Sequence, residues 1–291
     1  MNLSARRAGE QAGALPVLEQ RIVLDRVSKR FETGRSGRPA LALSELSLEI
    51  ERATFLALLG PSGCGKTTVL RLVDGLIAPD TGTVRVFGRE PQPGPEIGFV
   101  FQSFRLIPWA TVRGNLDFAL KEAGLSRAER GERVAHHLDL VGLSRVSDAY
   151  PRELSGGMKQ RVALARALAL EPKILLMDEP FASIDAQARE LMQIELMRIW
   201  MQQRPIVVFV THSVDEAILL ADRIAVFGPS PGRVVEVVDV ALERPRWNFD
   251  ARGDARFIEL RRHLAARMRS FVFSDPNSDF YGRDLDLPAR V

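Results

Sequence analysis

The sequence predicts an α/β fold, in which a parallel β-sheet covered by helices on both faces is preceded by a β-rich opening and interrupted by a helical insert. Two observations lead to this prediction. In the second half of the chain, strand-sized apolar runs alternate with helical patterns. These runs are apolar throughout, as expected for strands that are buried on both faces. The length of 291 residues suits one large domain or two modest ones.

The first part of the chain divides into a polar lead-in and the β-rich opening. Residues 1–20 are polar, small and unpatterned, and we expect them to be disordered. Short apolar runs separated by turn residues then predict five strands, at residues 22–27, 46–50, 55–59, 83–87 and 97–101. A loop rich in proline and glycine separates the last two strands.

The helical insert spans about residues 103–165. A capping-box pattern begins at Ser126, and apolar residues follow it at helical spacing. A second amphipathic helix is predicted at residues 158–169. The insert separates the opening from the rest of the core.

The core resumes after the insert and ends near residue 240. Its predicted strands lie at residues 174–177, 206–210 and 223–227, with helices at 186–201 and from 214 onward. We therefore expect one domain over residues 21–240. Residues 241–291 form a tail with an arginine-rich helix at 254–268 and a loose end.

Composition limits the classes of function. The formal net charge of +3 is too small to indicate nucleic-acid binding. No apolar stretch reaches the roughly 18 residues that span a bilayer, and the amino-terminal residues lack the apolar core of a secretion signal. Cys64 is the single cysteine, which excludes an internal disulfide and fits a reducing compartment. We expect a cytoplasmic protein.

Residues 60–67 match the phosphate-loop pattern G-x-x-x-x-G-K-[ST] in full, between an apolar strand and a helical run. The glycines let backbone N–H groups surround phosphate at the positive end of the helix. We expect Lys66 to reach the terminal phosphates of ATP, Thr67 to ligate Mg²⁺ and Thr68 to hydrogen-bond phosphate. Cys64 is not expected to be a catalytic thiol, because no histidine or second cysteine accompanies it. The predicted ATP-binding residues are Gly60, Pro61, Ser62, Gly63, Cys64, Gly65, Lys66, Thr67 and Thr68.

The apolar run at residues 174–177 ends in two acidic residues. Asp178 is delivered beside the phosphate loop, where it can hold Mg²⁺ directly or through water. Glu179 follows at the end of the strand, in a position suited to polarising an attacking water. Such a pair alone is often a helix cap or a solvated turn. Its combination with a phosphate loop favours ATP hydrolysis.

Residues 154–161 read Leu-Ser-Gly-Gly-Met-Lys-Gln-Arg, which resembles the signature of the ATP-binding cassette family. Ser155 is predicted to cap a helix, and Gly156 and Gly157 leave backbone donors bare at its positive end. This resemblance implies a P-loop NTPase core with an antiparallel β subdomain and a helical signature subdomain. It also implies a head-to-tail homodimer, in which the signature of one subunit closes over ATP on the phosphate loop of the other.

Four further residues match elements of this family, and the resemblance supplies their roles. Phe31 matches the aromatic residue that stacks on adenine, where tyrosine is commoner; from the sequence alone it could equally be a surface or core side chain. Gln102 matches the glutamine that contacts Mg²⁺ and the attacking water. Asp185 matches the loop that crosses the dimer seam, although its neighbours depart from the usual Ser-Ala-Leu. His212 matches the histidine that bonds the γ-phosphate, so the expected catalytic residues are Glu179, His212 and Lys66.

A partner is predicted from the stretch at residues 104–109, which places apolar residues and Trp109 in a loop expected to be exposed. In the family this region receives a membrane permease; packing within the insert is the alternative. The Pro-Trp pair and residues 244–262 resemble the importers of nitrate, taurine and other sulfonates, and the larger regulatory domains of sugar importers are not expected. This implies a peripheral subunit on the cytoplasmic face of the inner membrane. A periplasmic or extracellular solute-binding protein would act indirectly.

Other functions are weighed against this one. A cassette ATPase acting on ribosomes or DNA usually has two cassettes or a long coiled coil, and neither pattern is present. An exporter ATPase with a separate permease stays open. His136, His137 and His263 lie on predicted helices without a partner pattern, and we interpret them as structural or solvated.

Overall fold

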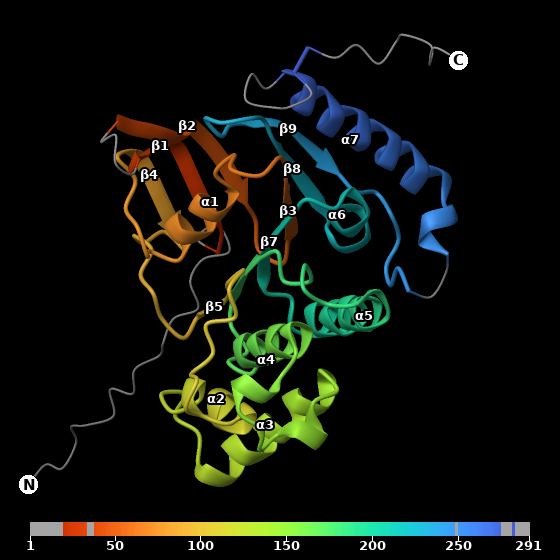
Figure 1. The fold of residues 1–291 in the computed structure, drawn as a ribbon. Coiled ribbons are helices and arrows are strands. Elements are labelled where there is room, and N and C mark those ends of the chain that lie inside the picture. The colour runs from red at the N-terminus through yellow and green to blue at the C-terminus, as the bar shows by residue number, and fades with distance from the viewer. Residues whose placement is uncertain (1–19, 34–37, 248–249, 275–280, 283–291) are drawn as a thin grey trace, which may run out of the picture.

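The computed structural model describes residues 20–33, 38–247, 250–274 and 281–282. The predicted disorder of residues 1–20 therefore lies outside the described residues, apart from Gln20, and so does most of the predicted loose end. Two sheets organise the described chain (Figure 1). None of the helices described is long and apolar enough to cross a bilayer.

The smaller sheet is antiparallel and has the order β2-β1-β4. Its strands are β1 (Ile22–Thr33), β2 (Arg38–Ile50) and β4 (Thr81–Val86). The first two are about twice as long as predicted, because their outer residues are polar and the prediction counted only apolar runs. Register shifts interrupt their pairing, which is typical of a strongly twisted ribbon.

The larger sheet has the order β5-β6-β7-β3-β8-β9 and is parallel except for its last strand. Its strands are β3 (Phe55–Leu59), β5 (Ile97–Val100), β6 (Ile174–Asp178), β7 (Ile206–Thr211), β8 (Arg223–Phe227) and β9 (Val234–Asp239). The five parallel strands agree with the prediction within one residue at each end. The edge strand β9 was not predicted; it alternates between half-buried and exposed residues.

Helices cover both faces of this sheet, and its strands divide their side chains between two cores. In β3, for example, Phe55 and Ala57 belong to one apolar cluster, and Leu56 and Leu58 belong to the other. The core helices are α1 (Lys66–Val73), α5 (Ala186–Gln203) and α6 (Val214–Leu220). The predicted parallel sheet buried on both faces is confirmed.

The segment between β5 and β6 is mostly helical and forms the lower part of the molecule in Figure 1. It contains α2 (Val112–Ala119), α3 (Arg127–Leu140) and α4 (Gly156–Leu168), with short 3-10 helices at Ser144–Val146 and Pro151–Glu153. The predicted capping box at Ser126 is present. The helix α2 was not predicted, because it is short and carries a glycine. Its buried Asn115 bonds the backbone of Ile107, Ala110 and Thr111.

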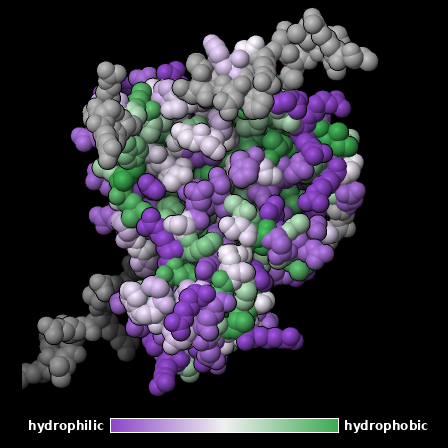
Figure 2. All heavy atoms as spheres, in the orientation of Figure 1, coloured by the Kyte–Doolittle hydropathy of each residue, from purple (hydrophilic) through white to green (hydrophobic). Residues whose placement is uncertain are grey.

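The tail returns to the core. After a 3-10 turn at Ala251–Gly253, α7 (Ala255–Ser274) runs beside α6 (Figure 1). It buries Phe257, Leu264 and Phe271, and Arg261 pairs with Asp215 at 2.8 Å. The helix is longer than predicted by six residues at its carboxyl end. Hydrophilic residues cover much of the face shown in Figure 2, with small apolar patches between them.

Candidate active site

The phosphate loop joins the end of β3 to the start of α1, as the sequence predicts. Gly65 is the N-cap of α1 and has φ of +91°, a left-handed conformation that favours glycine. A Cβ at this position would lie 2.6 Å from Leu43 and 2.7 Å from the carbonyl oxygen of Ala42. The loop is therefore packed closely against β2. The first N–H groups of α1 have no side-chain cap. This leaves them able to bind an anion.

Lys66 is bound to its own loop in this structure. Its ammonium donates to the carbonyl oxygens of Gly60 at 2.8 Å and Pro61 at 2.7 Å, and it lies 3.6 Å from Sγ of Cys64. Cys64 is buried, and burial raises the pKa of its thiol despite the nearby ammonium. A raised pKa lowers the fraction of Cys64 present as thiolate, which is the nucleophilic form. Thr68 is also buried.

Asp178 meets the phosphate loop at the end of β6. Its Oδ1 accepts a hydrogen bond from the Thr67 hydroxyl at 3.1 Å. Burial raises the pKa of Asp178; the hydrogen bond from Thr67 opposes the rise, and the negative charge of Glu179 adds to it. A buried carboxylate with a raised pKa gains from a nearby cation. One carboxylate and one hydroxyl, completed by phosphate oxygens, are donors that suit Mg²⁺.

Glu179 lies at the centre of the remaining polar groups. Its backbone has φ of +49° and its N–H donates to the carbonyl of Val210, which fixes it to β7. Oε2 accepts from Nε2 of Gln102 at 3.5 Å and lies 3.6 Å from Nδ1 of His212. The Glu179 side chain is 19% exposed, whereas that of His212 is 66% exposed. The structure thus brings three predicted residues, from the ends of three strands, to one side of the phosphate loop.

Glu216, which was not predicted from the sequence, organises the loop that carries His212. Its Oε2 accepts from the Thr211 hydroxyl at 2.7 Å, and its Oε1 accepts from Nε2 of Gln193 at 3.2 Å. Its N–H donates to Ser213, the N-cap of α6. An S-x-x-E capping-box spacing directly after the histidine was the signal that could have revealed it.

The signature residues occupy a different part of the molecule. Ser155 caps α4 by accepting from the N–H of Met158 at 3.3 Å. A Cβ on Gly156 would lie 3.8 Å from the Phe104 ring, and one on Gly157 would lie 3.1 Å from the carbonyl of Ser183. In the described part of the chain, no hydrogen bond or ion pair joins Ser155 or either glycine to the phosphate loop. The structure of one chain does not bring these two predicted anion sites together.

Asp185 and Phe31 also have local roles. Asp185 is the N-cap of α5 and accepts from the N–H of Ala188 at 2.9 Å. Phe31 is 37% exposed on β1, with the Lys29 ammonium 5.8 Å from its ring centre. The exposed ring remains accessible to a stacking partner.

The stretch at residues 104–109 is only partly as predicted. Trp109 is 82% exposed, in agreement with a loop that presents an aromatic side chain. Leu106, however, packs against the main core, and Phe104 and Ile107 are half-buried. The stretch was expected to be exposed, with packing within the insert as the alternative; exposure holds for Trp109, whereas these three residues pack, because Asn115 of α2 bonds the backbone of Ile107.

Two of the three histidines that showed no partner pattern in the sequence have partners in the structure. His137 is buried, and its Nδ1 lies 2.8 Å from the Arg133 carbonyl. His263 lies 2.8 Å from Glu236 on β9, so it helps to attach α7 to the sheet edge. Both positions are structural, as interpreted from the sequence.

Comparison with known proteins identifies the family. Residues 43–182 match the family model described as ABC transporter. An uncharacterized ABC transporter ATP-binding protein of Methanocaldococcus jannaschii is 45% identical over 248 residues, which cover 85% of this chain and 91% of that protein. The nitrate import ATP-binding protein NrtD of Synechococcus elongatus is 42% identical over 241 residues, which cover 81% of this chain and 87% of that protein.

Solved structures agree on the fold. The ATP-binding cassette MJ0796, in a dimeric post-hydrolysis state bound to ADP and phosphate, superimposes with a TM-score of 0.69 at 30% identity. The match covers 76% of this chain and all of that one. The predicted P-loop NTPase core of cassette type is confirmed. The chain belongs to the ABC transporter family and is an ATP-binding subunit whose hydrolysis of ATP is coupled to transport.

Proposed function

We propose that this chain energises the import of a small solute of the nitrate, sulfonate or taurine kind through a separate membrane permease. The observation that carries the proposal is the 42% identity to a nitrate import protein over 87% of that protein's length. The chain would act as a homodimer bound to the permease at the cytoplasmic face of the inner membrane. A solute-binding protein outside that membrane would deliver the cargo, and nucleic acid has no part in the cycle.

The phosphate loop would bind the triphosphate of ATP. Backbone N–H groups of residues 60–68 would surround the β- and γ-phosphates, and Lys66 would exchange its bonds to Gly60 and Pro61 for bonds to phosphate oxygens. Phe31 would stack on the adenine. Mg²⁺, held by Thr67 and Asp178 with Gln102 at its edge, would neutralise charge on the phosphates.

Glu179 would act as the general base. Its carboxylate is held by the backbone of β7 and lies between Gln102 and His212, so a water that it polarises would have defined neighbours. Glu179 would accept the proton as the water oxygen attacks the γ-phosphorus, and the bond to the β,γ-bridging oxygen would break. Gln102 would orient the water, and His212 would hydrogen-bond the γ-phosphate. General-base assistance of this kind is worth about 10²–10⁴-fold in rate.

The signature would complete the site from the partner subunit. Ser155 and the bare N–H groups of Gly156 and Gly157 form an anion site that the chain's own phosphate loop does not reach. A head-to-tail homodimer places this site on the γ-phosphate of the other subunit, and Asp185 lies in the loop that would cross the seam. The dimeric state of the cassette MJ0796 supports this arrangement.

The permease would bind beside the signature. Trp109 presents most of its surface to solvent, and exposed aromatic residues are enriched at protein interfaces. Phe104, in the same stretch, packs next to Gly156, so movement of the permease would reach the start of α4 directly. Closure of the ATP-bound dimer would tilt the permease, and hydrolysis would reopen it.

The direct test reconstitutes this chain with its permease and solute-binding protein in vesicles. ATP hydrolysis is then measured with nitrate, taurine or an alkanesulfonate added to the binding protein. One of these solutes is expected to stimulate hydrolysis and to accumulate inside the vesicles. Co-purification with ribosomes or DNA in place of an integral-membrane protein, or solute moving in the opposite direction, would overturn the proposal.

A further inference from the structure

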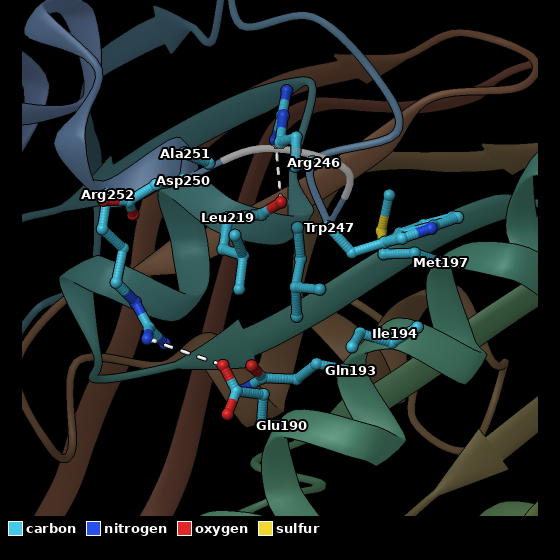
Figure 3. Close-up of a pocket in the computed structure, with 11 residues that line it drawn as sticks. Glu190, Gln193, Ile194, Met197, Leu219, Arg246, Trp247, Asp250, Ala251 and Arg252 are labelled. Carbon is cyan, nitrogen blue, oxygen red and sulfur yellow. Dashed lines mark hydrogen bonds and ion pairs between the residues drawn. The ribbon is translucent and has the colours of Figure 1, made fainter.

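A cavity of about 270 Å³ lies away from the predicted nucleotide residues, between α5, the end of α6 and residues 246–247 and 250–252 (Figure 3). Pockets for drug-sized ligands span about 300–1,000 Å³. This cavity is therefore suited to a small metabolite, and it is too small for a nucleotide or a folded peptide.

One wall of the cavity is apolar. Ile194 and Met197 project from α5, Leu219 comes from α6, and Trp247 and Ala251 come from the following segment. Met197 is 2% exposed, and the indole of Trp247 is half-buried. This wall offers hydrophobic contact and an aromatic face to the apolar part of a ligand.

The mouth of the cavity carries charged groups with spare hydrogen-bonding capacity. Glu190 and Arg252 face each other with 3.7 Å between their nearest nitrogen and oxygen atoms (Figure 3). This separation is longer than a hydrogen bond, and both side chains are more than half exposed. The carboxylate can therefore still accept, and the guanidinium can still donate, to a ligand placed at the mouth.

The formal charges around the cavity cancel. Glu190 and Asp250 supply two negative charges, and Arg246 and Arg252 supply two positive ones. Arg246 is 3% exposed and donates to carbonyl oxygens at the end of α6, and within the described residues its buried Nε–H has no acceptor. Asp250 is also occupied, because its carboxylate accepts from the N–H of Gly253, so Glu190 and Arg252 are the charged groups open to a ligand. A ligand with one positive and one negative group would match both of them.

We propose that this cavity binds a free amino acid with an apolar side chain. Its ammonium group would bind the Glu190 carboxylate and its carboxylate would bind the Arg252 guanidinium, so both groups of the exposed pair would gain hydrogen bonds. The side chain would lie against Met197 and Trp247. The inference does not depend on which solute the transporter carries.

The test titrates the purified full chain with L-phenylalanine by isothermal calorimetry. Two matched probes each lack one charged group: 3-phenylpropionate has no ammonium, and 2-phenylethylamine has no carboxylate. L-leucine and L-methionine test smaller side chains in parallel. At least one amino acid is expected to bind saturably, and loss of either charged group should weaken binding about ten- to a hundredfold. Absence of binding by all three amino acids at about 10 mM, or equal binding of the three phenyl probes, would overturn the proposal.

Variants locate the binding to the cavity. Glu190→Gln and Arg252→Gln are each expected to weaken binding about ten- to a hundredfold, because each removes one charge-assisted contact. Glu259→Gln and Arg262→Gln, on the exposed side of α7, are the matched controls and should leave it unchanged. Ile194→Phe fills the cavity and should abolish binding while ATP binding, measured in the same samples, reports an intact fold. Amino-acid binding that survives Ile194→Phe, or that weakens equally in the controls, would contradict the site.

Discussion

Two helix N-termini of the chain are proposed to bind phosphate, and they differ in what surrounds them. The start of α1 lies among a lysine, two acidic residues, a glutamine and a histidine. The start of α4 has Ser155 as its cap, with an aromatic ring and the backbone of Ser183 and Ile184 close to its glycines. One end carries the groups that can move protons, and the other offers only hydrogen-bond donors. Two equivalent sites would each duplicate the chemistry, whereas in the proposed dimer these two would complement each other.

The largest expected effect comes from removing the proposed general base beside the start of α1. Glu179→Gln keeps the shape of the side chain but removes the base, so turnover should fall by about 10²–10⁴-fold. ATP binding should persist, because the phosphate loop is unchanged, and the closed dimer should accumulate. Phosphate release, equilibrium dialysis with ATP and light scattering measure the three properties. Glu132→Gln, exposed on α3, is the control. Normal turnover in Glu179→Gln would remove Glu179 from its assigned role.

A second substitution tests the far ends of the same two helices. Asp74 is buried at the carboxyl end of α1, where burial raises its pKa from 3.8 to about 6. Ala169, which ends α4, is apolar. Because the folded state binds the Asp74 proton more tightly than the unfolded state does, stability is lost as the pH rises from about 4 through 6.

Asp74→Asn is expected to raise the free energy of unfolding at pH 7.5 by up to about 3 kcal/mol. The gain should shrink as the pH falls from about 6 towards 4. Chemical denaturation across this range measures it, with Asp25→Asn, an exposed aspartate, as the control. A gain independent of pH would show that the charge of Asp74 is not its cause.

Mixing two inactive variants tests whether the half-sites belong to different subunits. Lys66→Ala disables the phosphate loop, and Ser155→Arg disables the signature. In an equal mixture half of the dimers contain one copy of each, and such a dimer retains one intact site of two. About a quarter of wild-type hydrolysis should therefore return, if the sites act independently. Each variant alone is the baseline, and Ser155→Asn, which keeps a capping side chain, is the matched control. Failure of the mixture to exceed the baseline would refute the head-to-tail pair.

The smallest expected effect concerns the connection between the signature half-site and the membrane. Trp109→Ala removes an exposed side chain, so stability and ATP affinity should be unchanged. Solute transport per ATP hydrolysed should fall several-fold, on the order of the 1–2 kcal/mol that an interface anchor contributes. Phe118→Ala, which removes another exposed aromatic ring, is the control. An unchanged transport rate would place the permease elsewhere.

The sequence predicted the elements whose patterns are local. The parallel strands consist mostly of apolar residues, and each of the two glycine-containing motifs marks the start of a helix, so these elements were located within a few residues. The lengths of β1 and β2 were underestimated, because many of their residues are polar and exposed and therefore lie outside the apolar runs. The short helix α2 was not predicted, because the hydrogen bonds of Asn115 and the packing of α2 on α3 and α4 depend on tertiary structure.

The site was predicted as a set of residues but not as a geometry. Motif order named Gln102, Glu179 and His212, and the sheet order brings the three together. Glu216 was missed because its function depends on two side chains that the fold brings to it, Thr211 at the end of β7 and Gln193 on α5. The packing of Leu106 was left open as an alternative, because it too depends on contacts between separate elements. The periodicity of apolar residues predicts single helices and strands, and it does not predict which side chains of different elements come into contact.

Arg244 and Arg246 connect the tail to the helix that follows His212. Their guanidinium groups hold the carbonyl oxygens of the last turn of α6, the helix that begins two residues after His212. Shortening the protein at the predicted boundary near residue 240 would remove the hydrogen bonds that these guanidinium groups donate to that turn. The loss would spread back along two helical turns to the Thr211–Glu216 bond. A truncation meant only to remove the tail would therefore also destabilise the loop that carries His212.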